Sequence, residues 1–392
     1  MQQGAVSIVG SGHTKFGRLD AQTLEDLIVA AASEAIADAQ IDPGDIDAVF
    51  LGHFNAGLVP DAFASSLVTQ VSPKLRFKPA VRCENACASG SAAIYAGIAA
   101  IQAGQAEVVL VVGAEKMTSN TTKDVTRALA GAGYQNDPEE AKLSFPQVFA
   151  VAAQAYTQRY QSPMAAMAKI AVKNHANALK NPLAHMHRSM DFDACNEVSE
   201  KNPLIAPPLR LSDCSLITDG AAAIILVSAE RAKDFSREVV FRATSHVSDI
   251  LPMSGRDFLE FEGPQHAMAQ AFSRAGIKVG DLDFAEVHDC FTIAELLVYE
   301  AMGLAPKGAG HRVLDDGTVF RDGALPVNVS GGLKAKGHPV GATGVSMHAI
   351  SFRQLTGGAG DMQLNNPQLG LVFNMGGTGV ANYASVLEAR KA

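Results

Sequence analysis

The 392-residue sequence contains no tryptophan, 6% aromatic residues and five scattered cysteines. An odd, dispersed set of cysteines argues against a disulfide framework and favours a reducing compartment. The longest apolar runs are broken by glycine or charge well short of a bilayer span, which argues against a membrane protein. The formal net charge of −8 argues against a general nucleic-acid-binding protein. The first residues lack the basic region and cleavage site of a secretory signal, so we expect a cytoplasmic protein.

Small residues are abundant instead. Apolar residues, many of them alanine, make up 47% of the chain, and 35 residues are glycine. This composition is typical of an α/β enzyme with closely packed helices and strands. The length suffices for a large core and for two or three domains.

Two distant segments share one pattern. Residues 24–51 and residues 264–287 each contain a helical stretch, an isoleucine, a Gly-Asp turn, a further Asp and a strand. The similarity predicts an internal duplication, and hence an α/β fold whose two halves stack in layers about a pseudo-twofold axis. We place the halves at residues 1–115 and 240–392, with an inserted loop region at 116–239.

The duplication also relates two reactive side chains. Cys87 and His338 each open a helical stretch, with Gly90 and Gly341 three residues further on. Equivalent helix starts of a pseudo-symmetric pair can face each other, so we expect Cys87 to meet His338. The positive end of a helix stabilises a thiolate, the nucleophilic form of cysteine. Taken alone, Cys87 fits a small buried apolar residue better than a nucleophile.

Three further stretches contain groups suited to acyl transfer. A His-Asp-Cys-Phe sequence at 288–291 follows a strand, a Gly-rich loop at 328–344 contains His338, and a Gly-rich turn occupies 374–379. Each stretch alone is compatible with a structural role. A zinc site that includes Cys83 would lack the short paired spacing of structural zinc sites, so we predict no metal centre.

The inserted region contains a group of cationic residues that includes Lys173 and His175. Two interpretations remain open: a solvated helix face, or a clamp for the phosphates of a nucleotide-like ligand. Ser215 lies near the end of the insertion and either contacts a ligand or bonds locally in a turn.

Three motifs together resemble the thiolase superfamily: Asn-Ala-Cys-Ala-Ser-Gly at 85–90, His-Asp-Cys-Phe at 288–291 and Gly-His-Pro-Val-Gly-Ala-Thr-Gly at 337–344. The second resembles the sterol-carrier-protein type in particular. The resemblance implies an acetyl-CoA acetyltransferase or 3-ketoacyl-CoA thiolase of lipid and fatty acid metabolism. It also implies acyl-CoA and CoA as substrates, no tightly bound cofactor, no membrane or nucleic-acid partner, and a homodimer or homotetramer.

The resemblance further implies roles for individual residues. Cys87 would attack the carbonyl carbon and become acylated, while His338 takes its proton. Cys290 would be the second acid/base, and His288 would join His338 in polarising the thioester oxygen. The N–H of Cys87 and one near Gly376 would hold the oxyanion.

The sequence departs from the common thiolase pattern in two places. Many thiolases carry their acid/base cysteine in the C-terminal Gly-rich motif, where this chain has no cysteine. The alignment with the motif is therefore open by one residue, and the backbone N–H that donates to the oxyanion belongs to Met375 or to Gly376. Many also place asparagine where this chain has His288.

Two other functions remain alternatives to a thiolase. One is a decarboxylating 3-ketoacyl synthase of the same fold, and the other is a non-catalytic acyl-CoA-binding subunit.

Overall fold

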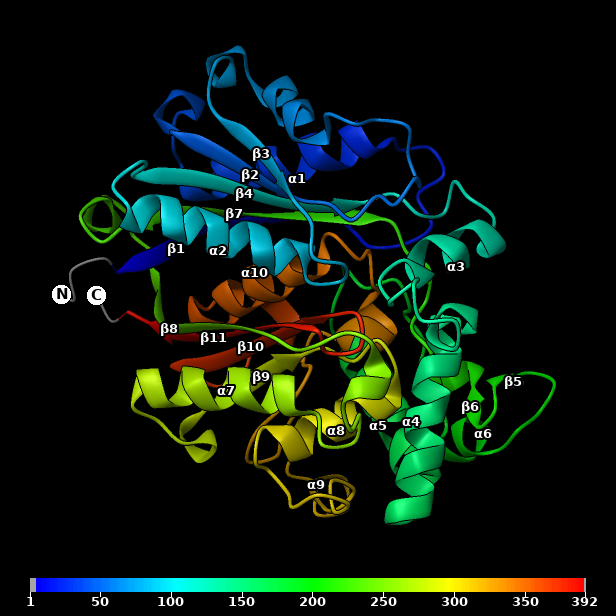
Figure 1. Cartoon of the computed structure of the whole chain (residues 1–392). Coiled ribbons are helices and arrows are strands. Elements are labelled where there is room, and N and C mark those ends of the chain that lie inside the picture. Colours follow the sequence, from blue (N-terminus) through cyan, green and yellow to red (C-terminus); the bar gives the residue numbers. More distant parts are fainter. Residues whose placement is uncertain (1–4, 391–392) are drawn as a thin grey trace.

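The computed structural model describes residues 5–390, which form two α/β halves joined through their sheets (Figure 1). The four residues before this range, on which the N-terminal prediction partly rests, lie outside it. The N-terminal half has its strands in the order β3-β2-β4-β7-β1. These strands are β1 (Val6–His13), β2 (Ala48–Gly52), β3 (Ala80–Cys83), β4 (Val108–Glu115) and β7 (Gly220–Ser228).

The C-terminal half repeats this order as β9-β10-β11-β8. The parallel and antiparallel pairings match those of the first half, and a parallel bridge from Ala285 to Val327 stands where β3 pairs with β2. A short antiparallel pairing of β1 with β8 joins the two halves. The predicted duplication is therefore confirmed. The strands are β8 (Val239–Ser248), β9 (Phe284–Val287), β10 (Leu369–Gly376) and β11 (Ala381–Ala389).

Helices separate and cover the two half-sheets (Figure 1). The central layer contains α2 (Ser89–Gln102) and α10 (Thr343–Leu355), and the outer layers contain α1 (Leu24–Ala39) and α7 (Glu262–Ala275). Residue Thr23 starts α1 through a capping box with Asp26. The buried helix α8 (Thr292–Ala301) follows β9, and α9 (Arg312–Asp315) is a short helix near the surface.

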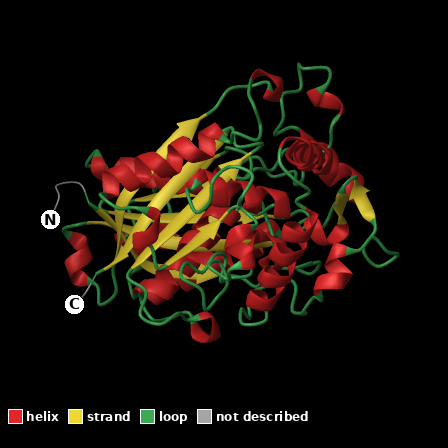
Figure 2. Ribbon diagram, turned by 90° about the horizontal axis from the view of Figure 1, so that it is seen from below, coloured by secondary structure: helices red, strands yellow, loops and turns green. Residues whose placement is uncertain are grey.

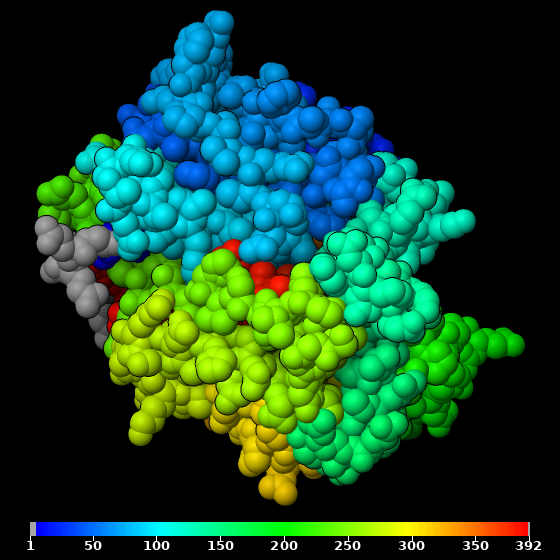
Figure 3. Space-filling model, in the orientation of Figure 1, coloured from blue at the N-terminus to red at the C-terminus, as the bar shows by residue number. Residues whose placement is uncertain are grey.

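The inserted region lies along one side of both halves (Figures 1 and 3). Figure 2 shows its small two-stranded sheet apart from the large one. Although β7 falls inside the predicted insertion of 116–239, it is a central strand of the N-terminal half, so the irregular part ends by residue 219. The insertion contains α3 (Thr122–Ala130), α4 (Phe145–Arg159), α5 (Met164–Ala178), α6 (Phe192–Asn196), β5 (Leu204–Ala206) and β6 (Leu209–Arg210).

No helix within residues 5–390 combines the length and apolar character that crossing a membrane requires.

Candidate active site

A cavity of about 600 Å³ lies between the two halves and the insertion, and Cys87, Cys290 and His338 contribute to its wall. Apolar side chains of α3, including Val125 and Leu129, line another part of it. The volume is within the range of small-molecule sites in proteins.

A tight turn positions Cys87 just before α2. Ala86 adopts a left-handed conformation with φ of 50°, which costs a residue with a side chain about 1–2 kcal/mol. The hydroxyl of Ser89 stabilises the turn because it accepts from the N–H of Asn85 at 2.9 Å and donates to the carbonyl of Ala86 at 2.6 Å. The position of the thiol is thus set by the start of α2.

The starts of α2 and α10 pack directly against each other. A Cβ atom added to Gly90 would lie 2.9 Å from the carbonyl oxygen of Gly341 and 2.8 Å from the backbone nitrogen of Val345. Such distances leave no room for a side chain, so glycine is required at this contact. The close approach is what brings Cys87 and His338 to one site.

The structure also brings His288 to this site. One potential ligand atom of each of Cys87, His288 and His338 lies within 4.8 Å of the others. The two imidazole rings meet edge to face, with centroids 5.2 Å apart. His288 directly follows β9, which pairs in parallel with β10, so its place follows from the C-terminal half-sheet.

Burial dominates the electrostatics of the cluster. It raises the pKa of Cys87 to about 12, against the lowering effect of a hydrogen bond from the backbone of Gly377. Burial and the nearby charge of Lys336 lower the pKa of His338 to about 3. Burial also lowers the pKa of His288 and raises that of Cys290 well above its ordinary value. The resting site therefore contains neutral thiols and neutral imidazoles, because burial disfavours the charged form of each group, and a thiolate at Cys87 is not favoured.

The Gly-rich turn after β10 adjoins the thiol. Gly376 packs against the carbonyl of Asn85, which would lie 2.3 Å from an added Cβ. The hydrogen bond that lowers the pKa of Cys87 comes from Gly377, one residue beyond the predicted donor Gly376.

Asn374 is a site residue that the sequence analysis missed. Its amide nitrogen lies 2.9 Å from Nδ1 of His288 and 3.2 Å from the carbonyl oxygen of Cys87, and its Oδ1 accepts from Ser91 at 2.8 Å. The signal in the sequence was an asparagine within the otherwise apolar run that forms β10, and the structure shows that this asparagine is fully buried.

Of the three predicted CoA contacts, the structure places only Ser215 on the cavity wall. Lys173 is 1% exposed and its ammonium group lies 2.9 Å from Glu295 and 2.7 Å from the carbonyl of Val327. His175 is also fully buried, and its Nδ1 donates to the carbonyl of Arg188 at 3.1 Å. Both side chains of α5 face the protein interior, so the predicted phosphate clamp is wrong for them.

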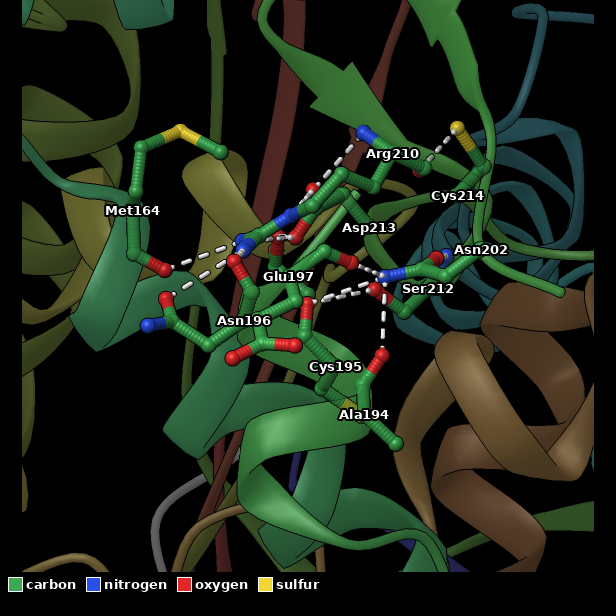
Figure 4. A network of polar contacts seen from close by, with 11 residues as sticks. Met164, Ala194, Cys195, Asn196, Glu197, Asn202, Arg210, Ser212, Asp213 and Cys214 are labelled. Carbon is green, nitrogen blue, oxygen red and sulfur yellow. Dashed lines mark hydrogen bonds and ion pairs between the residues drawn. The ribbon is translucent and has the colours of Figure 1, made fainter. Parts of the chain in front are cut away.

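A buried polar network around Arg210 supports the segment that contains Cys214, which lines the cavity (Figure 4). Arg210 is fully buried and binds Asp213 at 2.8 Å, the carbonyl of Asn196 at 2.7 Å and the carbonyl of Met164 at 2.9 Å. This ties α5 and α6 to the segment that leads into the cavity. The N–H of Ser215 then donates to the carbonyl of Cys290 at 3.1 Å, which connects this wall to the second thiol.

Comparison with known protein families identifies the family to which the chain belongs. Residues 6–193 match the family described as Thiolase, N-terminal domain, and residues 245–389 match Thiolase C-terminal domain-like. The chain belongs to the thiolase family. This confirms the resemblance found in the sequence and the prediction of an acyltransferase enzyme.

Individual relatives in the thiolase family match over most of the chain. An acetyl-CoA acetyltransferase of Methanothermobacter thermautotrophicus is 38% identical over 95% of this chain and 97% of its own length. Sterol carrier protein 2 of Oryctolagus cuniculus is 32% identical over 96% of this chain and 70% of its own length.

Solved structures show the same fold at low sequence identity. The Ltp2-ChsH2(DUF35) aldolase has a TM-score of 0.79 at 22% identity, with 99% of both chains covered. Human mitochondrial 3-ketoacyl-CoA thiolase in complex with CoA has a TM-score of 0.74 at 20% identity, covering 99% of this chain and 98% of that chain.

Proposed function

We propose that this thiolase cleaves 3-ketoacyl-CoA with CoA, or condenses two acyl-CoA units, through an acyl-enzyme on Cys87. The observation that carries the proposal is the presence of two thiols and a histidine, Cys87, Cys290 and His338, on the wall of one cavity. Acyl transfer by a ping-pong route needs a nucleophile and a second acid/base beside it.

In the cleavage direction, the sulfur of Cys87 attacks the 3-keto carbonyl carbon while its proton passes to His338. The carbon–carbon bond then breaks, and Cys290 protonates the departing carbanion to give acetyl-CoA. The thiol of free CoA then gives its proton to Cys290 as it attacks the acyl-Cys87 thioester, the shortened acyl-CoA leaves, and His338 returns its proton to the sulfur of Cys87. The N–H groups of Cys87 and Gly377 are the candidate donors to the oxyanion on the attacked carbonyl.

The neutral resting state fits this scheme. A thiol and an imidazole that are both uncharged let an apolar acyl chain enter without desolvating an ion pair. The charge then develops only as the carbonyl is attacked, when the backbone donors are in place. Ser215, on the cavity wall, is the remaining candidate among the predicted CoA contacts.

We further propose a homodimer that acts in cytoplasmic lipid or fatty acid metabolism. Strand β3 is the edge strand of the N-terminal half. Around it Phe63, Phe77 and Val81 are 81%, 88% and 48% exposed. An open strand edge flanked by exposed apolar side chains pairs readily with a second copy of itself.

The deciding experiment measures acetyl-CoA release from acetoacetyl-CoA with and without free CoA, for the native chain and for Cys87→Ala and Cys290→Ala. We expect activity that requires CoA and is lost in both variants. Turnover of longer 3-ketoacyl-CoA esters alone would assign a longer acyl group. Condensation that requires a malonyl donor would instead support the decarboxylating synthase. No turnover with any donor, in a folded protein, would support the acyl-CoA-binding alternative.

A further inference from the structure

Both histidines of the site leave one ring nitrogen free. Within residues 5–390, Nε2 of His288 and Nε2 of His338 are buried and have no hydrogen-bond partner. The Nδ1 atoms are bound, to Asn374 at 2.9 Å and to Thr343 at 2.7 Å. Because a neutral imidazole carries a single proton, the role of Nδ1 decides what Nε2 offers to a substrate.

The amide of Asn374 determines the tautomer of His288. Its Nδ2 contacts the carbonyl of Cys87, which only accepts hydrogen bonds, while Oδ1 accepts from the hydroxyl of Ser91. This fixes which end of the amide is the nitrogen. Nδ2 therefore donates to Nδ1 of His288, and the single proton of this imidazole lies on Nε2.

Thr343 determines the opposite tautomer of His338. Its hydroxyl donates to the carbonyl of Pro339 at 3.0 Å, the bond that a helical threonine makes to the residue four positions earlier. With its one proton used, Oγ1 accepts a hydrogen bond from Nδ1–H of His338. The Nε2 atom of His338 therefore has a free lone pair.

We propose that Asn374 and Thr343 hold the two histidines in opposite tautomers, so that His338 is the proton acceptor for Cys87 and His288 is the donor to the thioester oxygen of the substrate. Asn374 and Thr343 are positioning residues in this arrangement. The inference rests on the proposed function for the substrate's identity, but the tautomers themselves do not. Two identical tautomers would leave the site without either a base or a side-chain donor.

The same assignment distinguishes the site from a zinc centre. A cysteine and two histidines are ligand types that zinc uses, and their ligand atoms here lie within 4.8 Å of one another. A metal ion needs a lone pair from each ligand, and Nε2 of His288 carries a proton. Zinc would have to shift that proton to Nδ1 and break the hydrogen bond from Asn374, so we expect only weak binding.

The direct test is a ¹⁵N spectrum of native enzyme labelled at histidine, with the signals assigned by comparison with His288→Gln and His338→Gln. We expect a protonated, pyrrole-type Nε2 for His288 and an unprotonated, pyridine-type Nε2 for His338 at pH 7.5. The same type of Nε2 in both residues would overturn the proposal. This readout needs no turnover, so it stands apart from the outcome of the acyl-transfer assay.

A kinetic test uses Asn374→Leu, which removes the donor to His288 at similar volume. We expect kcat for acetoacetyl-CoA cleavage to fall about 100-fold or more, as for loss of an oxyanion donor, with little change in KM. The matched control is Ser385→Ala, which removes the bond from Ser385 to the buried His348 outside the site, 2.9 Å long. The control should keep native kcat. An unchanged kcat in a folded Asn374→Leu enzyme, or tight zinc inhibition of the native enzyme, would contradict the assignment.

Discussion

The pKa of Cys87 gives a quantitative prediction about its reactivity. With a pKa of about 12, the thiolate fraction at pH 7.5 is about 3 × 10⁻⁵, against about 0.1 for an ordinary thiol with pKa near 8.5. The greater nucleophilicity of the more basic thiolate recovers about 25–55-fold. Alkylation of Cys87 by iodoacetamide should therefore be about 100-fold slower than alkylation of a free thiol.

The pH dependence has a definite sign. Because the pKa is raised, the thiolate fraction should grow tenfold for each pH unit through the whole range from 6.5 to 9.5. The assay follows the mass of the Cys87 peptide in a Cys83→Ser background, since Cys83 is the one half-exposed cysteine. A rate that levels off between pH 7 and 8 would refute the reasoning. It would show that the helix start and the Gly377 N–H outweigh desolvation.

Three further predictions concern the surroundings of the site. Lys173→Met leaves Glu295 buried without its cation. It should lower the free energy of unfolding in urea by about 3–5 kcal/mol while KM for CoA stays native. A raised KM with native stability would instead support the phosphate clamp predicted from the sequence. Gly341→Ala places a Cβ 2.5 Å from the carbonyl of Ala114. It should cost about 1–3 kcal/mol in thermal unfolding and lower kcat, and native values would contradict the packing argument. Val81→Lys puts charge on the exposed β3 edge, so light scattering should show a smaller dimer fraction; an unchanged fraction would exclude this edge as the interface.

The sequence predicted the architecture well because its periodic signals are local. The helical stretch expected within residues 24–51 is present as Leu24–Ala39, and the repeated Gly-Asp turns identified the duplication. Cys87 and His338 do lie at one site, but they are not equivalent by symmetry, because Cys87 precedes the start of α2 by two residues and His338 precedes the start of α10 by five.

The errors came from contacts that no local pattern records. Lys173 has the spacing of a surface helix, but its partner Glu295 belongs to α8, more than a hundred residues away. The thiolate expected at Cys87 relied on the helix dipole, whereas the degree of burial, which depends on the whole fold, decides the pKa. The end of the insertion was placed too late at residue 239, because the run at 220–228 forms β7 and pairs with β4 and β1 of the N-terminal half.

The duplication also explains why the contact between His288 and Asn374 has no counterpart in the N-terminal half. By strand register, His288 after β9 and Asn374 in β10 correspond to Gly52 in β2 and Gly113 in β4. A Cβ on Gly52 would lie 2.6 Å from the Cα of Gly90, and one on Gly113 would lie 2.7 Å from the carbonyl of Gly341. In the N-terminal half these two positions must lack a side chain, because the starts of α2 and α10 pack against them. In the C-terminal half they carry the histidine and the amide that orients it, so the site arises where the two repeats differ.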